Sequence, residues 1–351
     1  MNAGTHASPP VPRPALRIDD GADVSASPFQ VEAAAVAAEA AGYDGFSASE
    51  TKHDVFASLM LAARATERIT LRTAIAVAFA RNPMTVATLA NDLQLVSGGR
   101  FELGLGSQVQ AHIERRFAMP WSRPAARMEE FLRAVRAIWA AWAGEDRLFF
   151  KGEFYQHTLM TEFFAPGANP HGTPPILLAA VGERMTQVAG RVADGLLCHA
   201  FTTPAYLRER TLPALLDARG GSLDGFSVLL PAMAVLGADA GERAAAEQAV
   251  RGQIAFYAST PAYRPVLDLH GWGELGERLH LLSRRGAWAE MAAEIPDDVL
   301  DAFAVAGTPA EVASALTARF GDAVTSVSLY TPYEVDRALT LAVARELRGQ
   351  E

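Results

Sequence analysis

The chain has 351 residues, of which half are hydrophobic and a fifth are charged, and its formal net charge is −9. This negative charge disfavours nucleic acid and acidic membranes as partners, because phosphate groups are bound by concentrated basic side chains. Cys198 is the only cysteine, which rules out a disulfide within the chain, and the scattered histidines support no metal site.

The amino-terminal segment differs in composition from the rest. Residues 1–14 contain four prolines and no apolar run of signal-peptide type, which predicts a disordered arm ahead of a single domain at 15–351. No other apolar run is long enough to span a bilayer. We therefore expect no membrane partner, and the single cysteine makes a reducing cytoplasm the simplest setting.

Strand-like and helix-like segments then alternate along the chain, as a parallel α/β architecture requires. Eight strands are predicted, the number that closes a (β/α)8 TIM barrel. They lie at 16–19, 45–49, 69–79, 101–106, 176–181, 195–199, 226–235 and 325–330. Helices are predicted at 31–41, 86–96, 127–142 and 186–193. Long insertions are expected after the fourth strand (109–122 and 144–173) and after the seventh (237–319).

The fourth strand carries the strongest local motif, SGGRFELGLGS at 97–107. Gly98 provides backbone angles that end the preceding helix. Gly104 and Gly106 leave room for a ligand to approach the carboxyl end of the strand. Because structural turns use the same glycines, the motif alone is weak evidence for a site.

Several further motifs agree in order and spacing. They are TAIAVAFARNP at 73–83, ANDL at 90–93, AAVGERM at 179–185 and AGRVADG at 189–195. Together they resemble the luciferase-like monooxygenase superfamily of flavin and deazaflavin enzymes, over residues 28–330. The closer resemblance is to its actinobacterial branch of oxidoreductases that are thought to use coenzyme F420. The resemblance also implies a homodimer.

The resemblance indicates where a cofactor would bind. It implies a bulge at Ala74-Ile75-Ala76, with a cis Ala74–Ile75 peptide bond, that supports one face of a flavin-type ring. It makes Glu50 a ligand of that ring and assigns His112 to the cofactor. The full set of cofactor-binding candidates is Glu50, Ala74, Ile75, Ala76, Gly106, Ser107, His112, Ala180, Val181, Gly182 and Arg184.

The phosphate site has a physical basis of its own. An apolar strand ends at Val181, Gly182 makes the turn, and a helix begins near Glu183. Free amides at a helix start bind anions, and glycine permits close approach. Glu183 would repel a phosphate unless it points away, and Arg184 would compensate. A routine strand-to-helix turn explains the same residues equally well.

The catalytic residues depart from the family pattern. Related sugar-phosphate dehydrogenases carry a histidine and a glutamate where this chain has Thr51 and Val109, so sugar-phosphate oxidation is disfavoured. His53 beside Asp54 is the first alternative for proton transfer, since the pKa of histidine is near neutrality, although such a histidine is often a cap or packing residue. The other catalytic candidates are His199 and Glu50.

Three functions remain open. The first is a coenzyme F420-dependent oxidoreductase that moves a hydride between the deazaflavin and a small organic substrate. The second is a two-component monooxygenase that uses reduced FMN from a separate reductase. The third is a barrel that binds a flavin without turnover. A basic, open groove for the cofactor tail would favour F420, and a short closed pocket would favour FMN.

Overall fold

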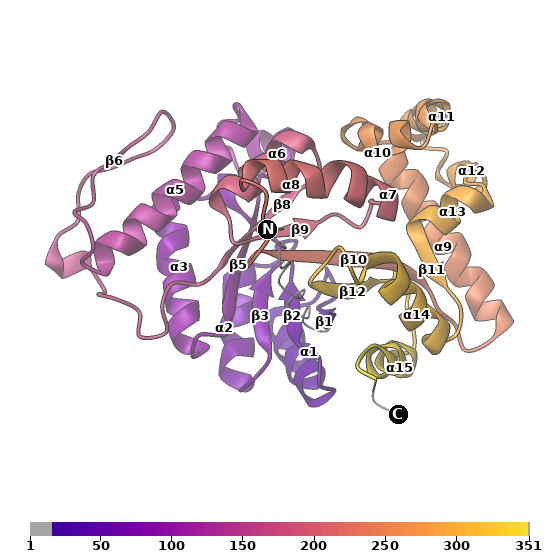
Figure 1. Ribbon diagram of the computed structural model, residues 1–351, viewed down its shortest axis with the longest axis horizontal. Helices are drawn as coiled ribbons and strands as arrows, with labels where there is room; N and C mark the ends of the chain where they lie inside the picture. Colours follow the sequence, from indigo (N-terminus) through magenta and orange to yellow (C-terminus); the bar gives the residue numbers. More distant parts are fainter. Residues whose placement is uncertain (1–15, 350–351) are drawn as a thin grey trace, which may run out of the picture.

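Parallel pairing closes the strands into a barrel (Figure 1). The computed structural model describes residues 16–349, and within that range eight strands pair in sequence until the last returns to the first. The (β/α)8 prediction is therefore confirmed. In order around the barrel, these strands are β1 (Arg17–Gly21), β2 (Gly45–Ala48), β3 (Thr70–Thr73), β5 (Phe101–Gly106), β8 (Ile176–Ala180), β9 (Gly195–Cys198), β10 (Ser227–Val235) and β12 (Ser326–Tyr330). The predicted arm at 1–14 lies outside the described residues.

The third strand is shorter than its apolar sequence suggests. The prediction of one strand over 69–79 is wrong, because β3 ends at Thr73 and only a two-residue strand, β4 (Ala76–Val77), follows it before the 3-10 turn η1 (Ala78–Ala80). The intervening Ala74–Ile75 peptide bond is cis, as the family resemblance implied. A hydrophobic run cannot reveal such an interruption, since its residues are apolar on both sides of it.

The two faces of β5 have different neighbours. Phe101, Leu103 and Leu105 are fully buried in the large core between barrel and helices. The alternate positions face the barrel interior, where a Cβ at Gly104 would lie 1.8 Å from the carbonyl oxygen of Thr73. The glycine is therefore required by packing inside the barrel.

Charged side chains fill the amino-terminal part of the barrel interior. Arg72 is fully buried and lies 2.5 Å from Asp19 and 2.7 Å from Glu102. Ser326 donates a hydrogen bond to the same Asp19 carboxylate. The partners come from four different strands, so this network joins opposite sides of the barrel.

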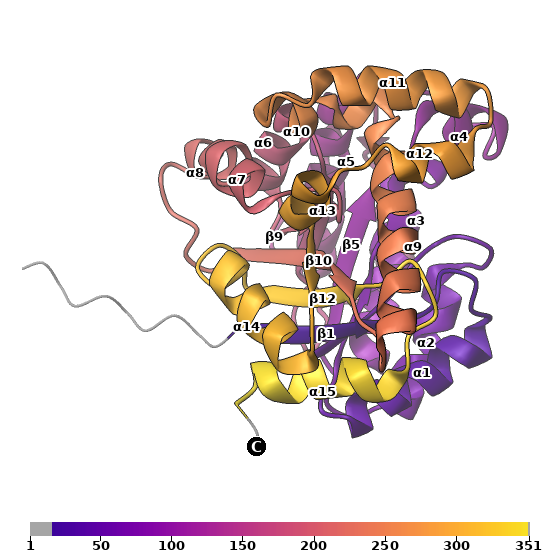
Figure 2. The same cartoon turned by 90° about the vertical axis from the view of Figure 1, so that its right-hand side faces the viewer.

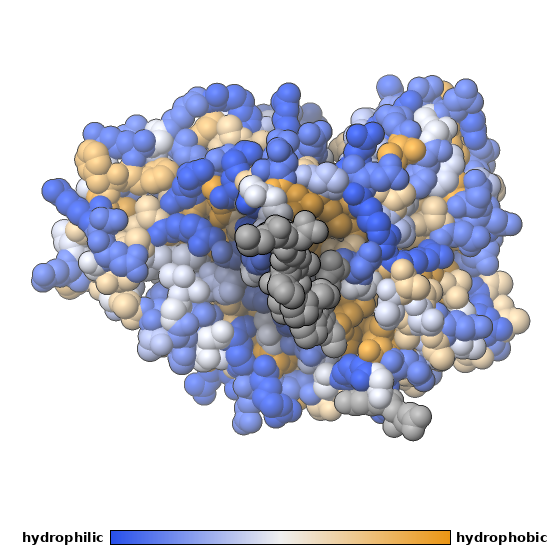
Figure 3. All heavy atoms as spheres, viewed as in Figure 1, coloured by the Kyte–Doolittle hydropathy of each residue, from blue (hydrophilic) through white to orange (hydrophobic). Residues whose placement is uncertain are grey.

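On the face drawn in Figure 3, hydrophilic residues predominate over the helices that cover the barrel. Three predicted helices begin three residues earlier than expected, because Pro28, Pro83 and Pro124 occupy their first turns, where a missing N–H costs nothing. The helices around the barrel are α1 (Pro28–Ala40), α2 (Val55–Ala65), α3 (Pro83–Val96), α5 (Pro124–Trp142), α6 (Glu183–Val192), α7 (Pro204–Tyr206), the π-helical turn η3 (Leu207–Thr211), α8 (Leu212–Ala218), α14 (Pro309–Phe320) and α15 (Arg337–Leu347).

Both expected insertions carry structure of their own. After β5 come α4 (Gln110–Arg115) and, beyond α5, the hairpin β6 (Phe150–Lys151) and β7 (Gln156–His157) with the 3-10 turn η2 (Glu162–Phe164). The insertion after β10, here called the C-terminal insert, is α9 (Ala240–Ala258), the 3-10 turn η4 (Pro261–Tyr263), α10 (Arg264–Leu269), α11 (Gly273–Arg284), α12 (Trp288–Ala293), α13 (Asp297–Phe303) and β11 (Ala304–Ala306). Figure 2 shows α11 and α12 at the same end of the molecule as α4.

Candidate active site

Small apolar side chains form a floor at the mouth of the barrel. Ala74, Ile75 and Ala179 are partly exposed, and they pack on one buried leucine from each of β8, β9 and β10. These leucines are Leu177, Leu197 and Leu229. Ala76 is fully buried and adds only backbone to this region. The apolar floor has the character that a planar ring needs on one face.

Glu50 and Arg81 fix the bulge beside the floor. The Glu50 carboxylate accepts a 2.8 Å hydrogen bond from the backbone N–H of Val77 and pairs with Arg81 at 2.7 Å. Arg81 also pairs with Asp54, which caps α2. Both Glu50 oxygens are thus engaged by Arg81, and the side chain is 7% exposed. As placed, Glu50 acts as a clamp between β2 and β4.

Two of the histidines predicted for the site, His53 and His112, are exposed on segments near the mouth. His53 is exposed in the loop before α2, and the Asp54 carboxylate beside it is engaged with Arg81 and with the backbone N–H groups of Phe56 and Ala57. His112 is exposed on α4. One turn later, Arg116 donates a 2.6 Å hydrogen bond to the carbonyl oxygen of Thr51. That bond joins the segment after β5 to the loop after β2.

The end of β5 packs closely against the floor. Gly106 is buried, and a Cβ there would lie 2.8 Å from the side chain of Ile75. Ser107 follows it and is partly exposed at the mouth. The glycine therefore allows Ile75 to lie across the strand, and the close approach expected from the sequence is made by the protein's own side chain.

The start of α6 is open, as an anion site requires. Gly182 is the N-cap residue, it is exposed, and a Cβ placed on it would meet no atom within 4 Å. Ala180 and Val181 precede it, both partly exposed, and Arg184 is exposed in the first turn. The free amides of this turn could bind a phosphate.

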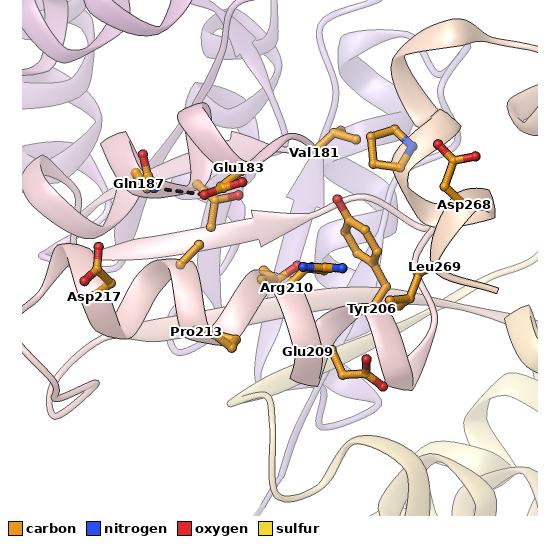
Figure 4. A pocket seen from close by; sticks show the side chains of 14 residues that line it. Val181, Glu183, Gln187, Tyr206, Glu209, Arg210, Pro213, Asp217, Asp268 and Leu269 are labelled. Carbon is orange, nitrogen blue, oxygen red and sulfur yellow. Dashed lines mark hydrogen bonds between the residues drawn. The ribbon is translucent and has the colours of Figure 1, made fainter. Parts of the chain in front are cut away.

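A cavity of about 610 Å³ lies beside this helix start (Figure 4). Glu183 and Gln187 of α6 stand at one end, Asp268 and Leu269 of α10 at the other, and Tyr206 and Arg210 between them. Four carboxylates and one arginine line it, so its electrostatic character is acidic; the carboxylates are Glu183, Glu209, Asp217 and Asp268. A narrower space shares Val181, Tyr206 and Thr211 with this cavity and reaches Ala180 and His199.

His199 follows β9 at the mouth and is surrounded by aromatic rings. Tyr263 of the C-terminal insert stacks on it with ring centroids 4.7 Å apart, and Tyr257 meets it edge-on at 4.7 Å. Burial lowers the pKa of His199 from its ordinary value to about 4. The imidazole is therefore neutral at physiological pH.

Sequence reasoning missed part of this arrangement. The predicted cofactor-binding residues include Ala180 and not Ala179, although strand alternation places residues 177 and 179 on the same face of β8. Tyr257, Tyr263 and Tyr330 were not site candidates, because the contact between the C-terminal insert and β9 spans more than sixty residues of sequence. The aromatic stretch FYASTPAY at 256–263 of the insert was the available signal.

The described chain holds no group of three or more His, Cys, Asp or Glu side chains placed to bind a metal ion. Between residues 16 and 349, no helix has both the length and the apolar character needed to cross a membrane.

Comparisons with known proteins agree with this architecture. The sequence model of the luciferase-like monooxygenase family matches residues 14–326. An uncharacterized protein of Mycobacterium tuberculosis is 52% identical over 289 residues, covering 82% of this chain and 85% of that protein. A putative coenzyme F420-dependent oxidoreductase of the same organism is 29% identical over an alignment that covers 77% of this chain and 82% of that protein. The coenzyme F420-dependent tetrahydromethanopterin reductase of Methanopyrus kandleri matches in structure with a TM-score of 0.78 at 21% identity, covering 96% and 98% of the two chains.

Proposed function

Because the chain belongs to the luciferase-like monooxygenase family, we propose that it is a coenzyme F420-dependent oxidoreductase that transfers a hydride between the deazaflavin and a small organic substrate. The observation that carries this proposal is the partly exposed apolar floor of Ala74, Ile75 and Ala179 at the carboxyl ends of the barrel strands. Such a surface supports a planar ring and leaves its opposite face to a substrate.

The residues present fit the ring and phosphate of such a cofactor. The floor would contact one ring face, and the open amides at Gly182 would bind a phosphate near the exposed Arg184. When bound, a deazaflavin supplies a carbon that gives or takes a hydride. The protein would hold the ring, exclude water from its covered face and orient the substrate on the other.

Two proteins that this chain is similar to support the F420 assignment. One mycobacterial relative is described as a putative coenzyme F420-dependent oxidoreductase, and a structural neighbour is an F420-dependent reductase. A homodimer and a cytoplasmic setting are parts of the same proposal. The exposed Phe163 and Phe164 of η2 support the dimer, since a second copy would cover them, and sedimentation velocity of the purified protein tests it.

A second candidate is a two-component monooxygenase that takes reduced FMN from a separate reductase. The acidic cavity next to Gly182 favours it, because four carboxylates would repel the long anionic tail of F420 along its length, whereas FMN ends in a single phosphate. Under the F420 proposal, the tail must instead leave toward solvent on the side of Arg184.

A binding titration separates the two candidates. The purified protein is titrated with F420 and FMN, each oxidised and reduced, using fluorescence quenching for the oxidised forms and calorimetry for the reduced ones. Tight F420 binding with weak FMN binding is the expected result. A preference for FMN overturns the proposal in favour of the second candidate, and binding of neither overturns both.

Two substitutions at Gly182 locate the phosphate. Gly182→Asp adds an N-cap carboxylate that competes for the free amides, and we expect it to weaken cofactor binding at least tenfold. Gly182→Ala is the matched control, because its Cβ meets open space and it adds no charge. Equal affinities of the two variants would place the phosphate elsewhere.

A further inference from the structure

The hydrogen bonds of His199 fix the position of its single proton. Its Nδ1 accepts a 3.0 Å hydrogen bond from the backbone N–H of Phe201. A ring nitrogen that accepts a hydrogen bond carries no hydrogen, so the proton of this neutral imidazole is on Nε2. The backbone two residues ahead therefore selects the tautomer.

This tautomer determines what the Tyr263 hydroxyl can do. Tyr263 Oη lies 3.0 Å from His199 Nε2, and it must accept the Nε2–H. Its own hydrogen is then available to another acceptor, and none is bonded to it among residues 16–349. Burial, together with the nearby Tyr330, raises the pKa of Tyr263, so this phenol stays protonated.

The neighbouring phenols are arranged differently. The hydroxyls of Tyr257 and Tyr330 lie 3.0 Å apart and hydrogen-bond to each other. Tyr257 touches the His199 ring with its edge and so packs in the same cluster as Tyr263, but its hydroxyl bonds to Tyr330 and not to the imidazole. Tyr257 therefore provides a matched comparison for Tyr263.

The cluster lies where a substrate would meet the floor. His199 and Ala180 line the same narrow space, and Ala180 directly follows Ala179 of the floor. Tyr263 of the C-terminal insert stacks on His199. A molecule that reached from the floor past Ala180 would therefore meet His199, against which Tyr263 is stacked.

The reaction needs such a donor. Hydride transfer to a carbonyl carbon leaves negative charge on the oxygen, and a fixed, desolvated hydrogen-bond donor stabilises that charge. Thr51 and Val109, which the resemblance aligns with the proton-transferring residues of the sugar-phosphate dehydrogenases, carry no titratable group.

Building on the proposed function, we propose that Tyr263 donates the hydrogen bond that holds the oxygen of a ketone, aldehyde or alcohol substrate, and that His199 is the positioning residue that aims this hydroxyl. The substrate class follows from the donor and the hydride together: the Tyr263 hydroxyl has its hydrogen free for an accepting oxygen, and the carbon of a carbonyl or alcohol is where a hydride is added or removed.

The test uses cyclohexanone labelled with ¹³C at its carbonyl as the probe and infrared spectroscopy as the readout. Spectra are recorded with the protein alone and with oxidised F420 present, where no hydride can move. A hydrogen bond from Tyr263 shifts the carbonyl band of the bound probe to lower wavenumber. We expect this shifted band in the native protein and in Tyr257→Phe, and its loss in Tyr263→Phe with at least a fivefold weaker probe affinity.

Two substitutions test the positioning role of His199. The His199→Gln side chain has an amide N–H that can take the place of the Nε2–H. The His199→Leu side chain is of similar size and has no hydrogen-bond donor. We expect His199→Gln to keep the shifted band and His199→Leu to lose it while folding like the native protein by circular dichroism. Loss of the band in both would show that the cluster only maintains structure and would overturn the assignment of His199.

The remaining outcomes are also decisive. Absence of a shifted band in the native protein, or its persistence in Tyr263→Phe, overturns the assignment of Tyr263. Equal losses in Tyr263→Phe and Tyr257→Phe do the same. Because the probe is also measured without cofactor, these results stand apart from F420 binding, whose failure overturns the proposed function alone.

Discussion

Arg81 and Glu50 meet 2.7 Å apart at the mouth of the barrel, with side chains 13% and 7% exposed, and so join the loop after β2 to the bulge that ends at β4. The same carboxylate accepts a hydrogen bond from the backbone N–H of Val77, so the Glu50 side chain binds both the Arg81 guanidinium and the main chain. The apolar floor lies beside this clamp, and its stability should depend on the pair.

Arg81→Met should destabilise the protein by about 3 kcal/mol, because it leaves the buried Glu50 carboxylate without its cation. Urea unfolding followed by circular dichroism measures the free energy of unfolding. The double variant with Glu50→Gln is the control, since a neutral amide can still accept from Val77. It should be more stable than Arg81→Met alone, and a double variant that is less stable would contradict this account.

Arg72→Met should cost about 3–5 kcal/mol, because Asp19 and Glu102 would remain charged inside the barrel. One Asp19 oxygen already has no hydrogen-bond partner within the described residues, so few neighbouring groups can stabilise the carboxylate once Arg72 is removed. Arg133→Met breaks an exposed i,i+4 pair with Glu129 and should cost under about 0.5 kcal/mol. Similar losses in the two variants, measured by urea unfolding, would rule out an essential interior network.

Gly104→Ala should destabilise the barrel by about 3 kcal/mol or more, because the new Cβ would lie 1.8 Å from the backbone oxygen of Thr73 and must displace a strand. Gly182→Ala adds the same methyl group to open space and should leave the melting temperature within a few degrees of the native value. Thermal melts of the two variants compare these sites directly. A Gly104→Ala variant as stable as the native protein would show that β3 and β5 can separate at little cost.

His199 should make stability fall as the pH falls. Burial lowers its folded-state pKa to about 4, below the value near 6.5 in the unfolded chain, so between these values the unfolded state binds more protons. The contribution of neutral His199 to the free energy of unfolding is fully present above pH 6.5. It is lost, by up to about 3 kcal/mol, as the pH drops toward 4. Urea unfolding at several pH values should show a shallower dependence in His199→Gln. An unchanged slope would mean that His199 takes up its proton without unfolding.

Local sequence was enough for the barrel. Alternating strands and helices at regular spacing specify a closed parallel sheet, because each strand must bury both faces and each helix one. The family resemblance, and not the local pattern, located the bulge and its cis peptide bond. Helix starts were missed by three residues at Pro28, Pro83 and Pro124, where the apolar periodicity begins only after the first turn.

The sequence by itself therefore determined the fold, the family and the segments that meet at the mouth. The tertiary structure decided which side chains meet there. Neither the clamp of Glu50 and Arg81 nor the pairing of His199 with Tyr263, 64 residues away, is visible in local sequence. The physical reason is that periodicity reports which residues are buried, whereas a hydrogen bond depends on distances within a few tenths of an ångström that only the closed barrel fixes.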